Sequence, residues 1–275
     1  MIRYRRVGEI PPPSHSLRGQ MNQMRGSWVI RKLKKGIPFL VVLFAPLSCG
    51  PKSSSITKEC ILPVDQTGTI TGRWTAKPVP VAVIANDFNS AELSAISAAI
   101  STWNSFFKAS KGFSLYLSNS VPAGTQTYTI ATVCGQNLVS ANGFMGPVLI
   151  QKARSGWPEN WKSAMALTST CPVAVAGSQF RSFISGVLQI NFQHFFNSGQ
   201  PIPDLQSVVA HELGHLLGLD HSCSGSGSQG IPSCSGADPE YLEALMYPAL
   251  GFDGNQGRIS RSVQKNDQER ANCLY

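Results

Sequence analysis

The spacing of apolar residues predicts alternating extended and helical segments from residue 60 onward. A β-branched run at residues 79–84 is bounded by prolines and by Asn86-Asp87, which indicates a buried strand. Other extended segments are predicted where aromatic or β-branched residues gather, at residues 113–117, 127–133 and 172–176.

Residues 187–196 alternate apolar and polar side chains. Leu188, Ile190 and Phe192 are separated by polar residues, and this period of two predicts a strand with one face in the core. Residues 135–169 lack such a period and contain several glycines, so we interpret them as a long loop with one short helix.

A helix is expected directly after the first strand. Asn89 can cap its first turn, and Glu92 stands three residues later, as in a capping box. The apolar positions then recur at alternating spacings of three and four residues, which places them on one helix face: Leu93, Ile96, Ile100, Trp103 and Phe107.

A second helix is predicted from a cap at Asp204 to a stop at Gly218. Residues 222–240 form a Ser/Gly-rich loop, and a last short helix covers about residues 266–275. The apolar positions of the second helix are Leu205, Val208, Val209, Leu213 and Leu216.

Composition is consistent with one main domain, because 42% of the 275 residues are hydrophobic and only 14% are charged. The formal net charge of +8 does not indicate a nucleic-acid partner. Residues 1–48 hold nine of the 23 Lys and Arg and one of the 15 Asp and Glu, which leaves 14 of each sign in the rest of the chain.

The basic residues belong to a predicted export leader at residues 1–48. Four Lys and Arg at 31–35 precede an apolar run from Ile37 to Leu47. This run is shorter than the ~20 residues that span a bilayer, although a short uncleaved anchor is the alternative. Translation from Met21 or Met24 would give a leader of ordinary length.

The segment Pro46-Leu47-Ser48-Cys49 resembles a bacterial lipobox, although Pro46 replaces the usual leucine. The resemblance implies cleavage before Cys49 and a lipid anchor there, with residues 49–59 as a tether and 60–275 as the folded domain. The protein is then expected in the cell envelope or, without the lipid, secreted. The six other cysteines suit three disulfides formed outside the cytosol.

The strongest chemical signal is the sequence His211-Glu212-Leu213-Gly214-His215. Two imidazoles four residues apart project from one helix face and can share a metal ion. Gly218 permits a sharp turn, after which His221 supplies a third ligand. The complete pattern is the metzincin signature of zinc peptidases.

The sequence Ala244-Leu245-Met246-Tyr247-Pro248 resembles a metzincin Met-turn, in which a methionine forms an apolar floor below the metal site. Together, the segment HELGHLLGLDHS at residues 211–222 and ALMYP at 244–248 resemble the matrixin branch. This resemblance implies an α+β, α/β-like fold. A twisted, mostly parallel five-stranded sheet is expected above an active-site helix and a small irregular C-terminal subdomain.

The chain also departs from animal matrixins. No cysteine-switch propeptide is evident, and no acidic loops indicate calcium. Outside the motif only His15 and His194 remain, and we interpret His194 as a strand residue and not a ligand. Leu250 replaces the aromatic residue expected in the wall of the S1′ pocket.

The expected reaction is peptide hydrolysis with one zinc ion, in which Glu212 takes a proton from the attacking water as a general base. We expect an exported, monomeric endopeptidase acting on proteins or peptides. Two alternatives are a narrow processing peptidase of one surface protein and a zinc-containing binding lipoprotein without catalysis. The binding module would have no need of Glu212. Asp220 is expected to accept a hydrogen bond in the ligand loop.

The loop after His221 is expected to need a covalent constraint. Cys223 lies two residues after His221, and mostly Ser and Gly separate it from Cys234, so we predict a Cys223–Cys234 disulfide. Six cysteines allow fifteen pairings. We favour Cys134–Cys171 and Cys60–Cys273 for the others.

Overall fold

The computed structural model describes residues 5–6, 62–84, 86–121, 134, 148–197 and 202–275. The chain divides into two units, and the described residues belong to the unit comprising Met1–Glu9 and Lys58–Tyr275. The predicted tether, Cys49, Cys60 and the strand predicted at 127–133 lie outside the described residues, as does the predicted leader except for Arg5–Arg6.

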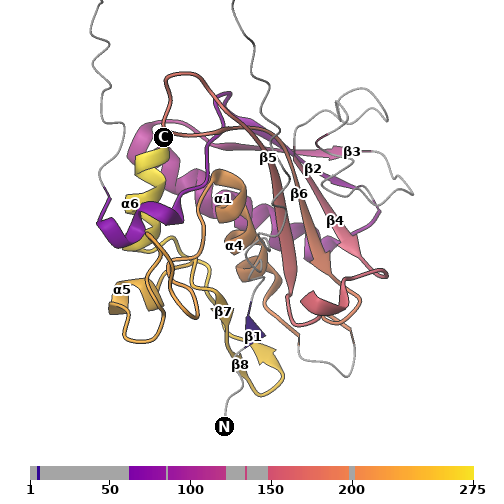
Figure 1. Cartoon of the computed structure of the whole chain (residues 1–275). Helices are drawn as coiled ribbons and strands as arrows, with labels where there is room; N and C mark the ends of the chain where they lie inside the picture. Colours follow the sequence, from indigo (N-terminus) through magenta and orange to yellow (C-terminus); the bar gives the residue numbers. More distant parts are fainter. Residues whose placement is uncertain (1–4, 7–61, 85, 122–133, 135–147, 198–201) are drawn as a thin grey trace, which may run out of the picture. The chain divides into compact units, whose positions relative to one another are not determined.

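A five-stranded mixed sheet forms the centre of the fold (Figure 1), in the order β3-β2-β4-β6-β5. All neighbouring strands are parallel except β5, which runs antiparallel to β6 along one edge. The expected mostly parallel five-stranded sheet is therefore confirmed. Its strands are β2 (Val79–Ile84), β3 (Tyr116–Val121), β4 (Val148–Ala153), β5 (Ala166–Val173) and β6 (Ser182–Asn191).

Two strands differ from the expectations for the first half of the chain. The strand predicted at 113–117 begins only at Tyr116, because Gly112 ends the preceding helix with φ 77° and Phe113 and Ser114 complete the turn. The interpretation of 135–169 as a loop was wrong for β4, a short strand that is buried at five of its six positions.

The remaining two strands also correct the predictions. Strand β5 begins at Ala166 and ends at Val173, so it starts before the predicted segment 172–176. Strand β6 is not half-buried, because β4 and β5 flank it and eight of its ten residues are buried. Phe192 follows the strand in a turn that also includes His194, so the interpretation of His194 as a strand residue was wrong.

Helix α1 (Ser90–Lys111) agrees with the prediction at its start, where Asn89 and Glu92 form the capping box. Its buried face contains Ile96, Ala99, Ile100, Trp103 and Phe107. Leu93 is 42% exposed, so its assignment to this face was wrong.

Helix α4 (Leu205–Leu217) lies beside α1 and against the sheet (Figure 1). The Trp103 indole donates a 2.8 Å hydrogen bond to Ala210 O. The Tyr116 hydroxyl donates one of 2.7 Å to Leu213 O. These buried bonds fix α4 against α1 and β3, and so they fix the helix that carries the metal motif.

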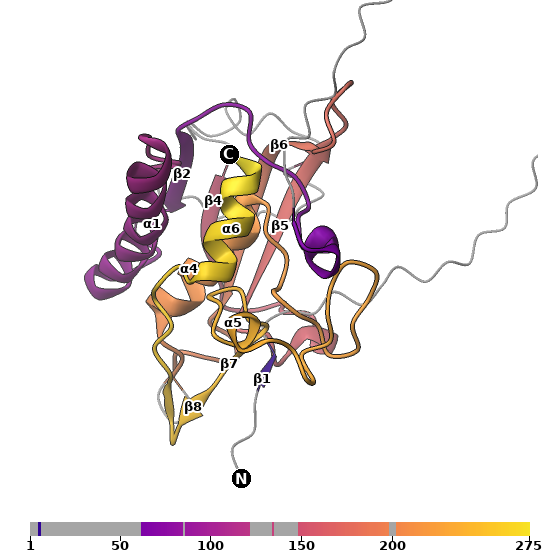
Figure 2. The same ribbon diagram turned by 90° about the vertical axis from the view of Figure 1, so that its left-hand side faces the viewer.

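The rest of the chain is less regular, as the resemblance implied for the C-terminal part. Helix α6 (Lys265–Leu274) ends the chain and lies in front of the sheet in Figure 2, where the segment containing α5 lies below it. None of the described helices is long and apolar enough to cross a membrane. The smaller elements are β1 (Arg5–Arg6), η1 (Val64–Thr69), η2 (Glu159–Trp161), α5 (Pro239–Leu242), β7 (Ala249–Leu250), which pairs with β1, β8 (Phe252–Asp253) and β9 (Gln256–Gly257).

Candidate metal centre and active site

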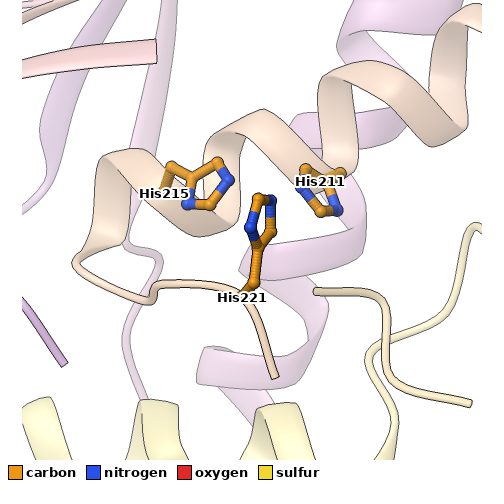
Figure 3. A group of neighbouring side chains, drawn as sticks. All are labelled: His211, His215 and His221. Carbon is orange, nitrogen blue, oxygen red and sulfur yellow. The ribbon is translucent and has the colours of Figure 1, made fainter. Parts of the chain in front are cut away.

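The structure brings the three predicted histidines together (Figure 3). His211 and His215 project from α4, and His221 projects between them from the segment that follows the helix. One ligand atom from each residue lies within 4.8 Å of the others. Three imidazoles in this arrangement can share one metal ion and leave a fourth position open.

Glycine at position 218 makes this arrangement possible. The chain leaves α4 at Gly218 with φ 116°, in the left-handed region. A Cβ atom there would lie 1.8 Å from Gly72 O, so the backbone of a second segment also excludes a side chain. The turn can therefore bring His221 back beneath the helix only with glycine.

Hydrogen bonds to the first two rings orient them for metal binding. His211 Nδ1 lies 2.8 Å from Leu245 O, and His215 Nδ1 lies 2.8 Å from Leu219 O. Because a carbonyl can only accept, each Nδ1 carries a proton, and in the neutral ring Nε2 then keeps a free lone pair. These outer partners hold both rings in the tautomer that presents Nε2 to the metal.

The buried nitrogen atoms fit a zinc ion. Nε2 of His211 and Nε2 of His221 are buried and have no hydrogen-bond partner among the residues described, which is costly unless another group binds them. Burial, followed by the electrostatic interaction with the His215 side chain, lowers the pKa of His211 to about 3. Burial likewise lowers the pKa of His221 well below its usual value. Both rings are thus neutral at pH 7, the form that zinc binds.

Glu212 lies between the two helical ligands and is only 1% exposed. Its Oε1 atom is buried and has no hydrogen-bond partner in the part of the chain that the structure describes. Burial raises the pKa of this carboxyl group. Thr168, on edge strand β5, donates a 3.3 Å hydrogen bond to the main-chain oxygen of Glu212 and so ties α4 to the sheet beside the site.

Met246 packs under the metal-binding helix and is fully buried. A Cβ atom on Gly214 would lie 2.2 Å from Met246 Sδ, which shows how closely the methionine approaches α4 between the two helical ligands. This is the position that the Met-turn resemblance implied.

Two residues of α6 hold the segments on either side of the site, and sequence analysis missed both. Asp267 accepts hydrogen bonds of 2.7 Å from Leu245 N and 3.1 Å from Met246 N. Arg270 pairs with Asp267 at 3.3 Å and donates a 2.8 Å bond to Asp220 O. The only sequence signal was a pair of charges three residues apart in a C-terminal helix, and many solvated helix faces show the same pattern.

A cavity of about 380 Å³ opens beside His211. Its lining comes from α4, from the Met-turn segment and from residues 258–260, and it includes Val208, Tyr247, Leu250 and Ile259. Leu250 therefore lies in a pocket wall next to the metal ligands, where an aromatic residue had been expected.

The structure places disulfides between Cys223 and Cys234 and between Cys134 and Cys171, with Cα–Cα distances of 5.0 and 5.5 Å. Cys273 is disulfide-bonded as well. Its partner is outside the described residues, so the pairing with Cys60 stays a prediction.

Asp220 accepts a 2.7 Å hydrogen bond from His221 N, the structural role expected for it. His194 is not part of the three-histidine group.

No curated protein matches the chain. Among solved structures, metalloproteinase-II from Bacteroides fragilis is 13% identical, with a TM-score of 0.37 over 80% of this chain. The match covers 60% of that protein's own length. High choriolytic enzyme 1, a hatching enzyme zinc-protease from the medaka fish Oryzias latipes, is 11% identical, with a TM-score of 0.32 over 74% of this chain and 94% of that one.

The converging histidines, the glutamate that follows His211 on the same helix, the buried methionine and the mixed sheet are together the features of the metzincin class of zinc peptidases. Within that class, residues 155–228 match the family model for matrixins, peptidase family M10. The matched segment runs from the start of the β4–β5 connection through the metal-binding helix and His221. The family resemblance inferred from the motif is confirmed.

Proposed function

We propose that this protein is an exported endopeptidase in which Glu212 acts as the general base. The observation that carries the proposal is the position of its carboxylate. It is buried, it lies on the helix that bears two metal ligands, and Oε1 has no hydrogen-bond partner among the described residues. A structural glutamate buried in this way would normally be paired.

Zinc held by His211, His215 and His221 would supply Lewis acidity toward the attacking water and the scissile carbonyl. Glu212 Oε1 then accepts a proton from that water as its oxygen bonds to the carbonyl carbon. The same carboxyl group gives the proton to the amide nitrogen as the C–N bond breaks. Burial raises the pKa of Glu212 above its usual value, the direction that suits a group that both takes and returns a proton.

The cavity beside His211 would receive one substrate side chain adjoining the scissile bond. Val208, Leu250 and Ile259 supply apolar surface, and 380 Å³ is enough for a large side chain. We therefore propose protein or peptide substrates with a large apolar residue at this position. Cleavage-site profiling with the purified protein would show whether many peptides or a narrow set are cut, which separates a general endopeptidase from a processing enzyme.

The test of the mechanism is Glu212→Gln, which removes the base and keeps the shape of the side chain. We expect stoichiometric zinc, and hydrolysis of a quenched peptide reduced by at least about 10²-fold. Glu159→Gln is the control, because Glu159 is an exposed glutamate that pairs with the exposed Lys162. Turnover by the Glu212 variant equal to that of the control would exclude this general base.

Export and lipid attachment at Cys49 form the second part of the proposal, and they rest on the basic and apolar pattern of residues 31–49. In cells, Cys49→Ser should move the protein from the detergent phase to the aqueous phase. A variant that remains equally membrane-bound, or a mature N-terminus elsewhere, would contradict the lipid anchor.

A further inference from the structure

His221 is the one proposed zinc ligand that α4 does not position. It lies beyond the reversal at Gly218, where no helical hydrogen bond constrains the backbone. The neighbouring residues Asp220 and Ser222 must therefore be held by other parts of the chain if His221 is to stay aligned with the two helical ligands.

Asp220 is held on both sides of its backbone. Its N–H donates a 2.7 Å hydrogen bond to Thr69 O, and its carbonyl accepts a 2.8 Å bond from Arg270 Nη1. On the other side of His221, Ser222 N donates a 2.9 Å bond to Met246 O. The Ser222 carbonyl, which follows His221, also has its donor in a distant part of the chain.

That donor is the side chain of Gln66, which lies in η1, 156 residues before Ser222 in the sequence. Gln66 Nε2 donates a 3.1 Å hydrogen bond to Ser222 O. Gln66 Oε1 accepts a 3.1 Å bond from Asn266 Nδ2 of α6. The exposed fractions of Gln66, Ser222 and Asn266 are 1%, 0% and 2%, so water cannot replace these bonds.

We infer that Gln66, itself oriented by Asn266, is a positioning residue for His221 and increases the zinc affinity of the site. This inference rests on the zinc site of the proposed function. Without Gln66 Nε2, the Ser222 carbonyl would be buried and unsatisfied, and the ligand segment could relieve that cost only by moving. Such movement displaces the adjacent His221 ring from the common metal position.

The effect should resemble the loss of other outer contacts that orient metal ligands, which typically lowers metal affinity about 10- to 100-fold. Gln66 lies outside the segment that matches the matrixin model, residues 155–228. Its proposed contribution therefore rests on the contacts of η1 and α6 with the ligand segment and not on the matched motif.

The test uses Gln66→Met, which preserves the length of the side chain and removes its polar atoms. Asn191→Leu is the matched control, because Asn191 is equally buried and donates a 2.8 Å bond to Ala164 O, away from the ligand segment. Zinc affinity is measured on the full chain by chelator competition. The unfolding midpoint of the zinc-free protein and the absorption spectrum of the cobalt form are recorded alongside.

We expect Gln66→Met to weaken zinc binding about 10- to 100-fold and to alter the cobalt spectrum, while Asn191→Leu lowers the unfolding midpoint without either change. Asn266→Ala should weaken zinc binding less, because Gln66 keeps its donor. The two losses should not add in the double variant, since both act through one amide. If Gln66→Met does not fold, Asn266→Ala alone carries the test.

Unchanged zinc affinity in both Gln66→Met and Asn266→Ala would overturn the inference, and so would an equal loss in Asn191→Leu. Failure of the zinc site itself looks different. In that case the unaltered chain would bind no zinc, or His221→Ala would bind it as tightly as the unaltered chain does.

Discussion

The two halves of the metal centre are built in different ways. His211 and His215 are one turn apart on α4, so the helix itself sets their spacing and local sequence is sufficient to align them. His221 reaches the same point only because η1, the Met-turn segment and α6 hold the chain around it. The comparison teaches that two ligands are encoded locally and the third by packing from distant parts of the chain.

The largest effect is expected when the buried Arg270–Asp267 pair, which supports the segment that carries His221, loses one partner. Arg270 and Asp267 are 1% and 0% exposed, and removing one partner of such a buried pair costs about 3–5 kcal/mol. Arg270→Met should lower the free energy of unfolding by that amount, measured by urea denaturation of the zinc-free protein.

Lys162→Met is the control for this comparison. Lys162 is 58% exposed and its partner Glu159 is 79% exposed, and exposed pairs contribute about 0–1 kcal/mol. A loss for Arg270→Met no greater than that for Lys162→Met would show that the buried pair does not support the ligand segment.

Two glycines test the same difference, because Gly218 lies in the turn before His221 and Gly214 lies on α4 between the other two ligands. Gly218→Ala forces a positive φ, at about 1–2 kcal/mol, and places Cβ against a backbone oxygen, which adds about 1–3 kcal/mol. Gly214→Ala meets mainly the end of the flexible Met246 side chain. Alanine also favours the helix by about 1 kcal/mol. We expect the first variant to lose both stability and zinc, and the second to retain zinc.

Thermal unfolding with and without added zinc measures both variants. If Gly214→Ala lost more stability and more zinc than Gly218→Ala, the helix would be more tightly constrained than the turn that leads to His221. That result would contradict the proposed difference between the two parts of the site.

The smallest effect concerns the substrate cavity and should leave both halves of the metal centre intact. Leu250→Trp would fill part of the cavity beside His211, so kcat/KM should fall for peptides with large side chains relative to small ones. Discrimination worth about 1–3 kcal/mol is typical for apolar pockets. An equal fall for all peptides, or a loss of zinc, would argue against Leu250 as a wall of the pocket.

The same difference between local sequence signals and contacts from distant segments explains what could be predicted from the sequence. The ligands, the caps at Asn89 and Asp204 and the stop at Gly218 are signals carried within a few residues, and the structure has these elements where they were expected. Strand β4 was missed because its apolar core, Val148–Ile150, is too short to show a period.

The supporting residues were beyond prediction for another reason. Gln66 and Arg270 bind backbone carbonyls, and a carbonyl is present at every residue, so nothing in the sequence marks which one will be a partner. Only the packing of η1 and α6 against the ligand segment identifies Ser222 and Asp220 as those partners.

The most direct test of the central claim is zinc removal and replacement, with hydrolysis of a quenched peptide and metal content measured on the same sample. The account predicts one zinc per chain, hydrolysis that disappears when a chelator removes the metal, and recovery when zinc is restored. Because the ligands must be His211, His215 and His221, His215→Ala should neither hold zinc nor recover. Undiminished hydrolysis by fully zinc-depleted protein, or normal zinc content in the His215 variant, would contradict the account.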